Sequence, residues 1–233
     1  YATSLNNLAY LYNSIGKYEQ AEPLFIQALE LKKQLQGVNH PSYATSLNNL
    51  ALLYNSIGKY EQAEPLYIQA LELYKQLLGV NHPDTAMSLN NLAYLYKSQR
   101  KYEEAEPLFI QALELRKQLQ GVNHPDTAIS LNDLALLYSN QGKYEEAEPL
   151  YIQALELTKQ LQGVNHPDTA MSLNNLALLY NSQGKYEAAE PLYIQPLEIL
   201  ERILGENHPN TVTFRNNFED LRAQRGEGGS SEE

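Results

Sequence analysis

The chain repeats one 42-residue unit along most of its length, and this period constrains the fold more than any other feature. Residues 1–42 and 43–84 differ at only five positions, and the same opening recurs at Ala2, Ala44, Ala86, Ala128 and Ala170. A unit this short cannot bury an apolar side alone, so neighbouring units must stack and share a continuous core. The period therefore predicts an elongated repeat array and not a globule.

Each unit contains two helix patterns. In residues 43–84, apolar side chains recur every three or four residues from Ala44 to Tyr54 and again from Tyr60 to Leu77, which aligns each set along one side of a helix. Gly58 ends the first helix, because glycine adopts the left-handed conformation at little cost. Short turns force neighbouring helices to run antiparallel. The predicted fold class is all-α, built from antiparallel helix pairs.

The linker between units carries helix-start signals. Asn81 or His82 can serve as the N-cap, Pro83 suits the first helical position, and Asp84 favours the positive end of the next helix. Each linker holds one histidine, about a repeat from the next: His40, His82, His124, His166 and His208. Metal ligands must converge on one ion, and the chain has no cysteine. We expect these histidines to have a structural role in the linkers, and we expect neither a metal nor a cofactor.

The repeated motif resembles the tetratricopeptide repeat. The residues that carry the resemblance are Leu47-Asn48-Asn49-Leu50-Ala51-Leu52-Leu53-Tyr54, Gly58-Lys59-Tyr60, Ala63-Glu64, Tyr67, Ala70, Gly79 and His82-Pro83-Asp84-Thr85-Ala86. The 42-residue length and the His-Pro linker are similar to the repeats of kinesin light chains and of related bacterial, especially cyanobacterial, proteins. The resemblance implies a right-handed superhelical solenoid, with first helices lining a concave groove that binds peptides or proteins.

The expected domain organisation follows the period. The solenoid covers 1–225, with repeats at 1–42, 43–84, 85–126, 127–168 and 169–210 and a capping helix at 211–225, followed by a disordered tail at 226–233. In the capping helix, Arg215, Glu219 and Arg222 replace residues that are apolar or aromatic in the repeats. The absence of a starting methionine suggests a fragment. Leu5, Leu8 and Leu11 predict weak self-association through the uncapped first repeat.

The resemblance places a peptide-binding groove on the first helices. An Asn side chain offers both donors and an acceptor, which match a peptide backbone. The candidate residues are Asn48, Asn49, Leu52, Asn55, Asn90, Asn91, Tyr94, Lys97, Asn132, Asp133, Leu136, Asn174, Asn175 and Leu178. Two alternatives stay open: one Asn of each pair ties adjacent helices together, because consecutive residues point about 100° apart, and the Leu and Tyr positions pack between repeats.

Charge limits the partners. The formal net charge is −11 and no basic stripe is present, so we expect neither nucleic acid nor an anionic membrane as a partner. Among the groove candidates only Lys97 is basic, with Arg215 at the rim, which favours a neutral or basic extended segment over an acidic one. We expect a cytoplasmic location, and no apolar run approaches the ~20 residues of a membrane span.

These patterns favour a non-enzymatic protein–protein interaction scaffold that binds an extended peptide or partner segment. The alternatives are an architectural spacer or self-association module, and the sensor arm of a larger signalling protein. An enzyme is the least favoured class, since no nucleophile elbow, phosphate loop or metal motif is present.

Overall fold

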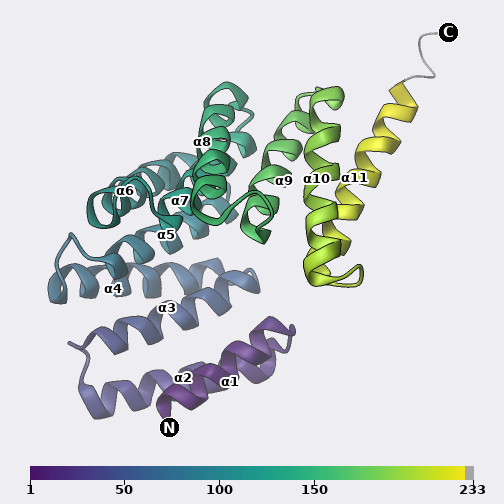
Figure 1. The fold of residues 1–233 in the computed structure, drawn as a ribbon. Helices are drawn as coiled ribbons and strands as arrows, with labels where there is room; N and C mark the ends of the chain where they lie inside the picture. Colours follow the sequence, from purple (N-terminus) through teal and green to yellow (C-terminus); the bar gives the residue numbers. More distant parts are fainter. Residues whose placement is uncertain (229–233) are drawn as a thin grey trace. The chain divides into compact units, whose positions relative to one another are not determined.

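The computed structural model describes residues 1–228, and its regular elements in that range are all helices (Figure 1). In chain order they are α1 (Ala2–Ser14), α2 (Tyr18–Gln36), α3 (Pro41–Ser56), α4 (Tyr60–Leu77), α5 (Pro83–Ser98), α6 (Tyr102–Gln120), α7 (Pro125–Asn140), α8 (Tyr144–Gln162), α9 (Pro167–Ser182), α10 (Tyr186–Leu204) and α11 (Pro209–Gly228). Each repeat therefore supplies an odd-numbered first helix and an even-numbered second helix. The predicted all-α class is confirmed.

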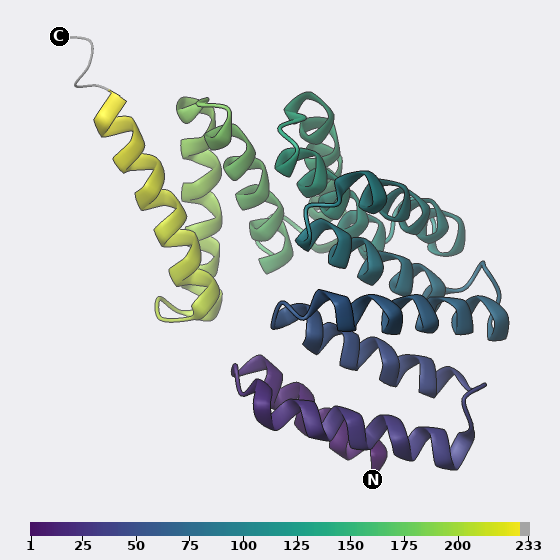
Figure 2. The same cartoon turned by 180° about the vertical axis from the view of Figure 1, so that it is seen from behind.

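The helices group into two compact units, Tyr1–Leu119 and Gln120–Glu233, which we describe separately. In the first unit, α1 packs on α2, α2 on α3, α3 on α4 and α4 on α5; in the second, the same succession runs from α7 to α11. First helices also contact one another, α3 with α5, α7 with α9 and α9 with α11. Figures 1 and 2 show the successive helix pairs of each unit lying side by side. A row of adjacent first helices is thus present within each unit.

The linker histidines start the first helices. The backbone N–H of Asp84 donates to His82 Nδ1 at 3.1 Å, and the same bond links Asp126 to His124 at 3.1 Å. His82 has an extended backbone, as N-caps do, and Pro83 follows in the first helical turn. Of the two N-cap candidates, the structure selects the histidine. Among residues 1–228 no group of three or more His, Cys, Asp or Glu side chains is placed to hold a metal ion.

The turn inside each repeat requires a left-handed residue. Gly58 has φ 74°, and its N–H donates to Asn55 O while the N–H of Lys59 donates to Tyr54 O at 2.8 Å. This pair of bonds is the Schellman closure of a helix C-terminus. Arg100 makes the equivalent bonds with φ 59°, and it is the only residue other than glycine with a positive φ in the described part of the chain. Arg100 thus places a side chain in the left-handed conformation that glycine adopts at the equivalent turns.

Alanine lines the helix crossings of the core. Ala21 and Ala63 on second helices and Ala51 and Ala93 on first helices are fully buried. Larger side chains at such positions would force the backbones apart. Around them pack large residues such as Phe25, whose cluster joins α1 and α2 to α3 and α4. Each cluster contains residues of two repeats, or of the last repeat and α11, so a repeat is stabilised by its neighbour, as the period predicts.

The last helix keeps this packing with different surface residues. Phe214 packs against Ala170, Ile199 and Leu200, and Leu221 is buried against Ala177. Helix α11 begins two residues before the predicted 211–225 range, at the His208–Pro209 start signal, and continues to Gly228. Residues 226–228 of the predicted tail are therefore helical, and 229–233 lie outside the described residues. No helix within residues 1–228 is long and apolar enough to cross a membrane.

We expect Arg100→Gly to raise the free energy of unfolding by about 1 kcal/mol, because a side chain at positive φ costs roughly that amount. The matched control is Gly184→Ala at the equivalent turn, where φ is 71° and a Cβ meets open space. That control should lower stability by a similar amount, through backbone strain alone. Urea unfolding measures both, and an Arg100→Gly protein no more stable than the parent contradicts the strain.

Candidate functional site

Each of the interior first helices α3, α5, α7 and α9 keeps one main accessible strip, because packing covers most of its other residues, whereas α1 is more exposed. On α7 the strip contains Ile129, which is 51% exposed, half-buried Asn132, and Leu136, which is 37% exposed. On α9 it contains Met171, Asn175 and Leu178, with the two apolar residues 45% and 38% exposed. The positions follow i, i+3 or i+4, and i+7, which is one side of a helix. We call these six residues the α7–α9 strip.

The first unit has an equivalent strip with different chemistry. On α5, exposed Met87 is followed by half-buried Asn91, Tyr94 and Lys97, and the Lys97 ammonium lies 4.6 Å from the centre of the Tyr94 ring. On α3 the corresponding accessible residues are Thr45, Leu52 and Asn55. The strip residue nearest the N-terminus of the helix is therefore a threonine on α3 and an apolar residue on α5, α7 and α9. We call the set of strip residues at one such level, taken across adjacent helices, a row.

The predicted asparagines divide into two groups. Asn91, Asn132 and Asn175 keep accessible surface, whereas Asn48, Asn49, Asn90, Asp133 and Asn174 are buried. Among these consecutive Asn–Asn and Asn–Asp positions, only the first group has surface for a ligand, and the Oδ1 atom of Asn132 is itself buried. Which member of a pair is accessible changes from helix to helix: the first on α7 and the second on α5 and α9.

Some asparagines connect adjacent repeats. Asn49 Nδ2 donates to Asn6 Oδ1 at 2.9 Å, and Asn217 Nδ2 donates to Asn174 Oδ1 at 3.1 Å. Tyr10 Oη donates to the same Asn49 side chain at 2.6 Å. At these junctions the amides bind each other across the repeat boundary, which is the structural alternative that the sequence left open.

The Leu and Tyr positions vary together with a residue on the second helix. Where the first helix has tyrosine, the second has phenylalanine, and the rings meet edge to face: Tyr10 with Phe25 at 5.4 Å and Tyr94 with Phe109 at 5.3 Å. Where the first helix has leucine, the second has a buried tyrosine: Leu52 with Tyr67, Leu136 with Tyr151, and Leu178 with Tyr193. Each pair thus contains one tyrosine hydroxyl, either on the first helix or on the second. Where the first helix has leucine, the strip presents only an apolar side chain at that position.

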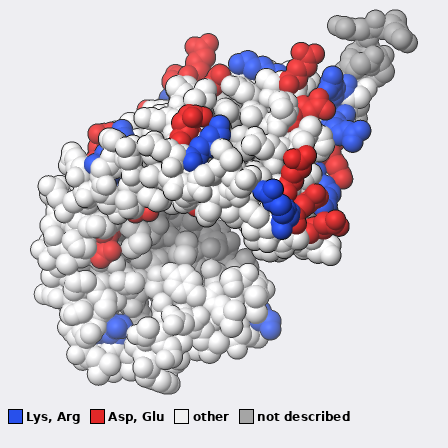
Figure 3. Space-filling model, in the orientation of Figure 1, with Lys and Arg blue, Asp and Glu red and all other residues white. Residues whose placement is uncertain are grey.

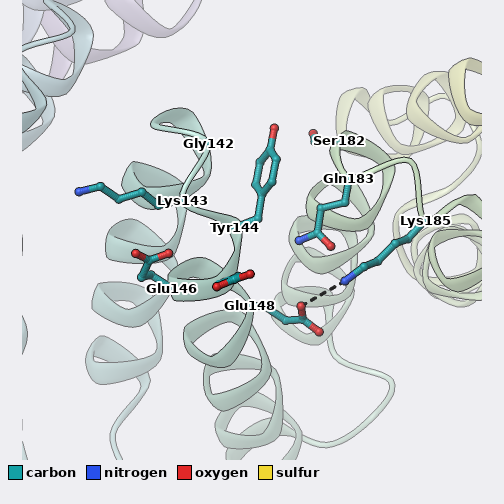
Figure 4. A pocket seen from close by; sticks show the side chains of 9 residues that line it. Gly142, Lys143, Tyr144, Glu146, Glu148, Ser182, Gln183 and Lys185 are labelled. Atoms are coloured by element: carbon teal, nitrogen blue, oxygen red, sulfur yellow. Dashed lines mark ion pairs between the residues drawn. The ribbon is translucent and has the colours of Figure 1, made fainter.

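A second candidate is a cleft between repeats, beside the turns. In the second unit it has a volume of about 670 Å³ and is lined by α8 residues such as Tyr144, Glu146 and Glu148 and by Gln183 and Lys185 near the next turn (Figure 4). An equivalent cleft of about 490 Å³ in the first unit includes Tyr60, Glu64 and Lys101. Because the clefts recur at equal positions, repeat stacking generates them.

The carboxylate in each cleft already has partners. Tyr180 Oη donates to Glu148 Oε1 at 2.9 Å and Lys185 Nζ lies 3.5 Å from Glu148 Oε2, the ion pair drawn in Figure 4. Tyr96 and Lys101 hold Glu64 in the same way. Burial and the adjacent Glu64 raise the pKa of Tyr96 to about 12. We call this Tyr–Glu–Lys group the inter-repeat clasp, and its role is structural.

One row of the strip was not predicted from the sequence. Met87, Ile129 and Met171 were not among the candidates, although all three are exposed. The signal was present, since each lies seven residues before Tyr94, Leu136 or Leu178, which places it on the same side of the helix. Charged side chains gather elsewhere, for example over α10 and α11 in Figure 3, where Glu201 pairs with Arg215.

Stacked helical hairpins of nearly identical sequence, with one accessible strip on each first helix, define an α-helical repeat scaffold. The chain belongs to the tetratricopeptide repeat family, whose model matches residues 1–76, 48–118, 84–160, 126–201 and 168–227. The comparison with curated protein sequences gave no match. Tetratricopeptide repeats in general are non-enzymatic scaffolds for protein–protein interaction.

Solved structures support the same assignment. The chain is similar to the nearly identical TPR-like repeats of a putative kinesin light chain from Podosopora anserina, with 26% identity, a TM-score of 0.73, and coverage of 86% of this chain and 94% of that one. BtubC (BKLC) from P. vanneervenii is 28% identical with a TM-score of 0.73, covering 88% of this chain and 81% of that one. The predicted kinesin light chain-like tetratricopeptide type is confirmed.

A third structure shows the fold alone. A Rap protein complexed with competence and sporulation factor is 19% identical, with a TM-score of 0.64, and the match covers 97% of this chain and 65% of the Rap chain.

We expect Glu148→Ala to lower the free energy of unfolding by about 1 kcal/mol, because Tyr180 and Lys185 lose their shared acceptor. Glu156→Ala is the matched control, since its ion pair with Lys159 is exposed and lies within one helix. That control should change stability by less than about 0.5 kcal/mol. Equal effects of the two substitutions in urea unfolding contradict a stabilising clasp.

Alkaline pH tests the buried tyrosines. Burial, with a contribution from Asp220, raises the pKa of Tyr193 to about 12, and burial also raises the pKa of Tyr67 and Tyr151. A raised pKa means that the neutral hydroxyl stabilises the fold fully below the ordinary value near 10 and loses this effect as pH rises through the folded value. Replacing all three with Phe, the residue at positions 25 and 109, should move the alkaline unfolding midpoint upward.

Circular dichroism across pH 9–13 measures that midpoint, with the exposed Tyr18→Phe as the control that leaves it unchanged. An unchanged unfolding midpoint in the triple variant contradicts a contribution of the buried tyrosine hydroxyls to alkaline unfolding.

Proposed function

We propose that the protein is a non-enzymatic scaffold that binds an extended peptide or partner segment across adjacent first helices. The observation that carries this proposal is the α7–α9 strip, where accessible amides and leucines recur on two helices that contact each other. Most other residues of α7 and α9 are buried by packing. A ligand of this face therefore has the strip as its binding surface.

The amides suit a ligand's main chain. Asn175 can offer a peptide unit both donors and an acceptor, which suit its carbonyl and N–H. Asn132 Oδ1 is buried, so Asn132 can offer a ligand carbonyl its N–H donors without rearrangement. Adjacent helices are spaced by about 10 Å and an extended chain advances ~3.3 Å per residue, so one amide meets about every third ligand residue. Contacts of this kind bind the backbone and leave selectivity to the apolar rows.

Charge favours a neutral or basic segment. The α7–α9 strip has no ionisable side chain, and the nearest acidic candidate, Asp133, is buried. The chain as a whole is acidic, with a formal net charge of −11, which disfavours nucleic acid and anionic surfaces. On the first unit Lys97 is the one basic residue among the candidates.

The comparisons support the class of function. The Rap structure holds competence and sporulation factor, and the kinesin light chain-like relatives share the repeat type. Self-association through α1 and a cytoplasmic location remain predictions of the sequence.

A peptide-display selection on the full chain tests the proposal. We expect enriched peptides whose affinity falls at least about tenfold in Asn132→Ala/Asn175→Ala, since one net hydrogen bond contributes about 1 kcal/mol. The control is Gln153→Ala, which removes an exposed amide from the second helix α8. Unfolding curves of both variants should overlay the parent's.

Failure has two clear forms. Either no peptide is enriched over an unrelated helical protein, or enriched peptides bind the double Asn variant as well as the parent.

A further inference from the structure

The α7–α9 strip has apolar side chains on both sides of its amides. Ile129 and Met171 lie toward the N-terminal ends of the two helices, and Leu136 and Leu178 lie seven residues later. Seven residues span two helical turns, or roughly 10 Å, with the asparagine level about midway. Two apolar rows therefore run parallel to one central polar row across the two helices.

An extended peptide has the same layout. Its successive side chains point to opposite sides of the backbone, and its carbonyl and N–H groups lie between them. With the backbone over Asn132 and Asn175, one set of side chains faces the Ile129 and Met171 row. The other set faces the Leu136 and Leu178 row.

The spacing of the helices selects a pattern of ligand residues. Three extended residues span about 10 Å, which is one helix spacing, and an odd step reverses the side to which a side chain points. If residue i faces Ile129, residue i+1 faces Leu136, i+3 faces Leu178 and i+4 faces Met171. Residue i+2 lies between the helices.

Resting on the proposed function, we infer that the α7–α9 strip recognises an extended neutral segment with apolar side chains at i, i+1, i+3 and i+4. The two rows supply the selectivity and the central amides hold the backbone. The equivalent strip of the first unit fits this pattern less well. On α5, Tyr94 occupies the position of Leu136, and on α3, Thr45 occupies the position of Met171. The second unit is the selective one.

Two blocked peptides of identical composition test the pattern. Acetylated and amidated S-V-V-S-V-V-S places valine at all four positions, and it reads the same in both chain directions. Its isomer V-S-V-S-V-S-V can match only two of the four in any register. We expect the first to bind the full-length protein about tenfold or more tightly than the second, since two more apolar side chains become buried.

Substitutions in each apolar row test whether that row contacts the peptide. Met171→Ser and Leu178→Ser should each weaken S-V-V-S-V-V-S several-fold and leave V-S-V-S-V-S-V less affected. Ile152→Ser on α8 is the control, because Ile152 is exposed to a similar degree on a second helix. Fluorescence polarisation with labelled peptides measures each affinity, and urea unfolding verifies that the variants stay folded.

The outcomes separate the pattern from the broader function. Equal affinity for the two isomers overturns the two-row pattern, and the proposed function stands if both still depend on Asn132 and Asn175. Display-selected peptides that lack the four-position pattern, together with no binding of S-V-V-S-V-V-S, also overturn it. Loss of S-V-V-S-V-V-S binding in Ile152→Ser places the site on the second helices and overturns both.

Discussion

Every repeat depends on burial against its neighbour. A helical hairpin of 42 residues has too little interior to fold alone, and the fully buried residues lie where one pair packs on the next. Ala51 and Ala63 let the helices approach, while Tyr67 and Leu89 fill the space around them. The inter-repeat clasp adds a directional contact at the rim of this packing. Stability is therefore a property of junctions between repeats.

This dependence also defines the candidate binding surface. Packing covers most of the other residues of α3, α5, α7 and α9, so a residue such as Leu178 remains exposed while Leu176 and Leu179 beside it are buried. The candidate strip is narrow for that reason, and an equivalent strip recurs on each of these four helices. Its chemistry changes with few substitutions, as in the exchange of Leu136 and Tyr151 for Tyr94 and Phe109. Because the pair changes together, the surface varies while an aromatic ring stays buried in the core.

The helices and turns could be predicted from the sequence because their signals are local and repeated. Gly58, the His82–Pro83 start and the three- to four-residue spacing of apolar residues act within one unit. The left-handed conformation of Arg100 agrees with the glycines at its equivalent positions. The site was harder to predict. Whether Asn132 or Asp133 keeps surface depends on how two repeats rotate against each other, which spacing alone does not specify. Ile129 and Met171 were missed because an apolar residue in a helix is normally interpreted as a buried core residue.

The most direct test of peptide binding by the first helices is to locate a bound peptide on the chain. A display-selected peptide carrying a photoreactive diazirine side chain can be cross-linked to the full chain and the adducts mapped by mass spectrometry. Binding along the α7–α9 strip predicts adducts on α7 and α9, within Pro125–Asn140 and Pro167–Ser182. Adducts confined to the second helices α8 and α10 would contradict it.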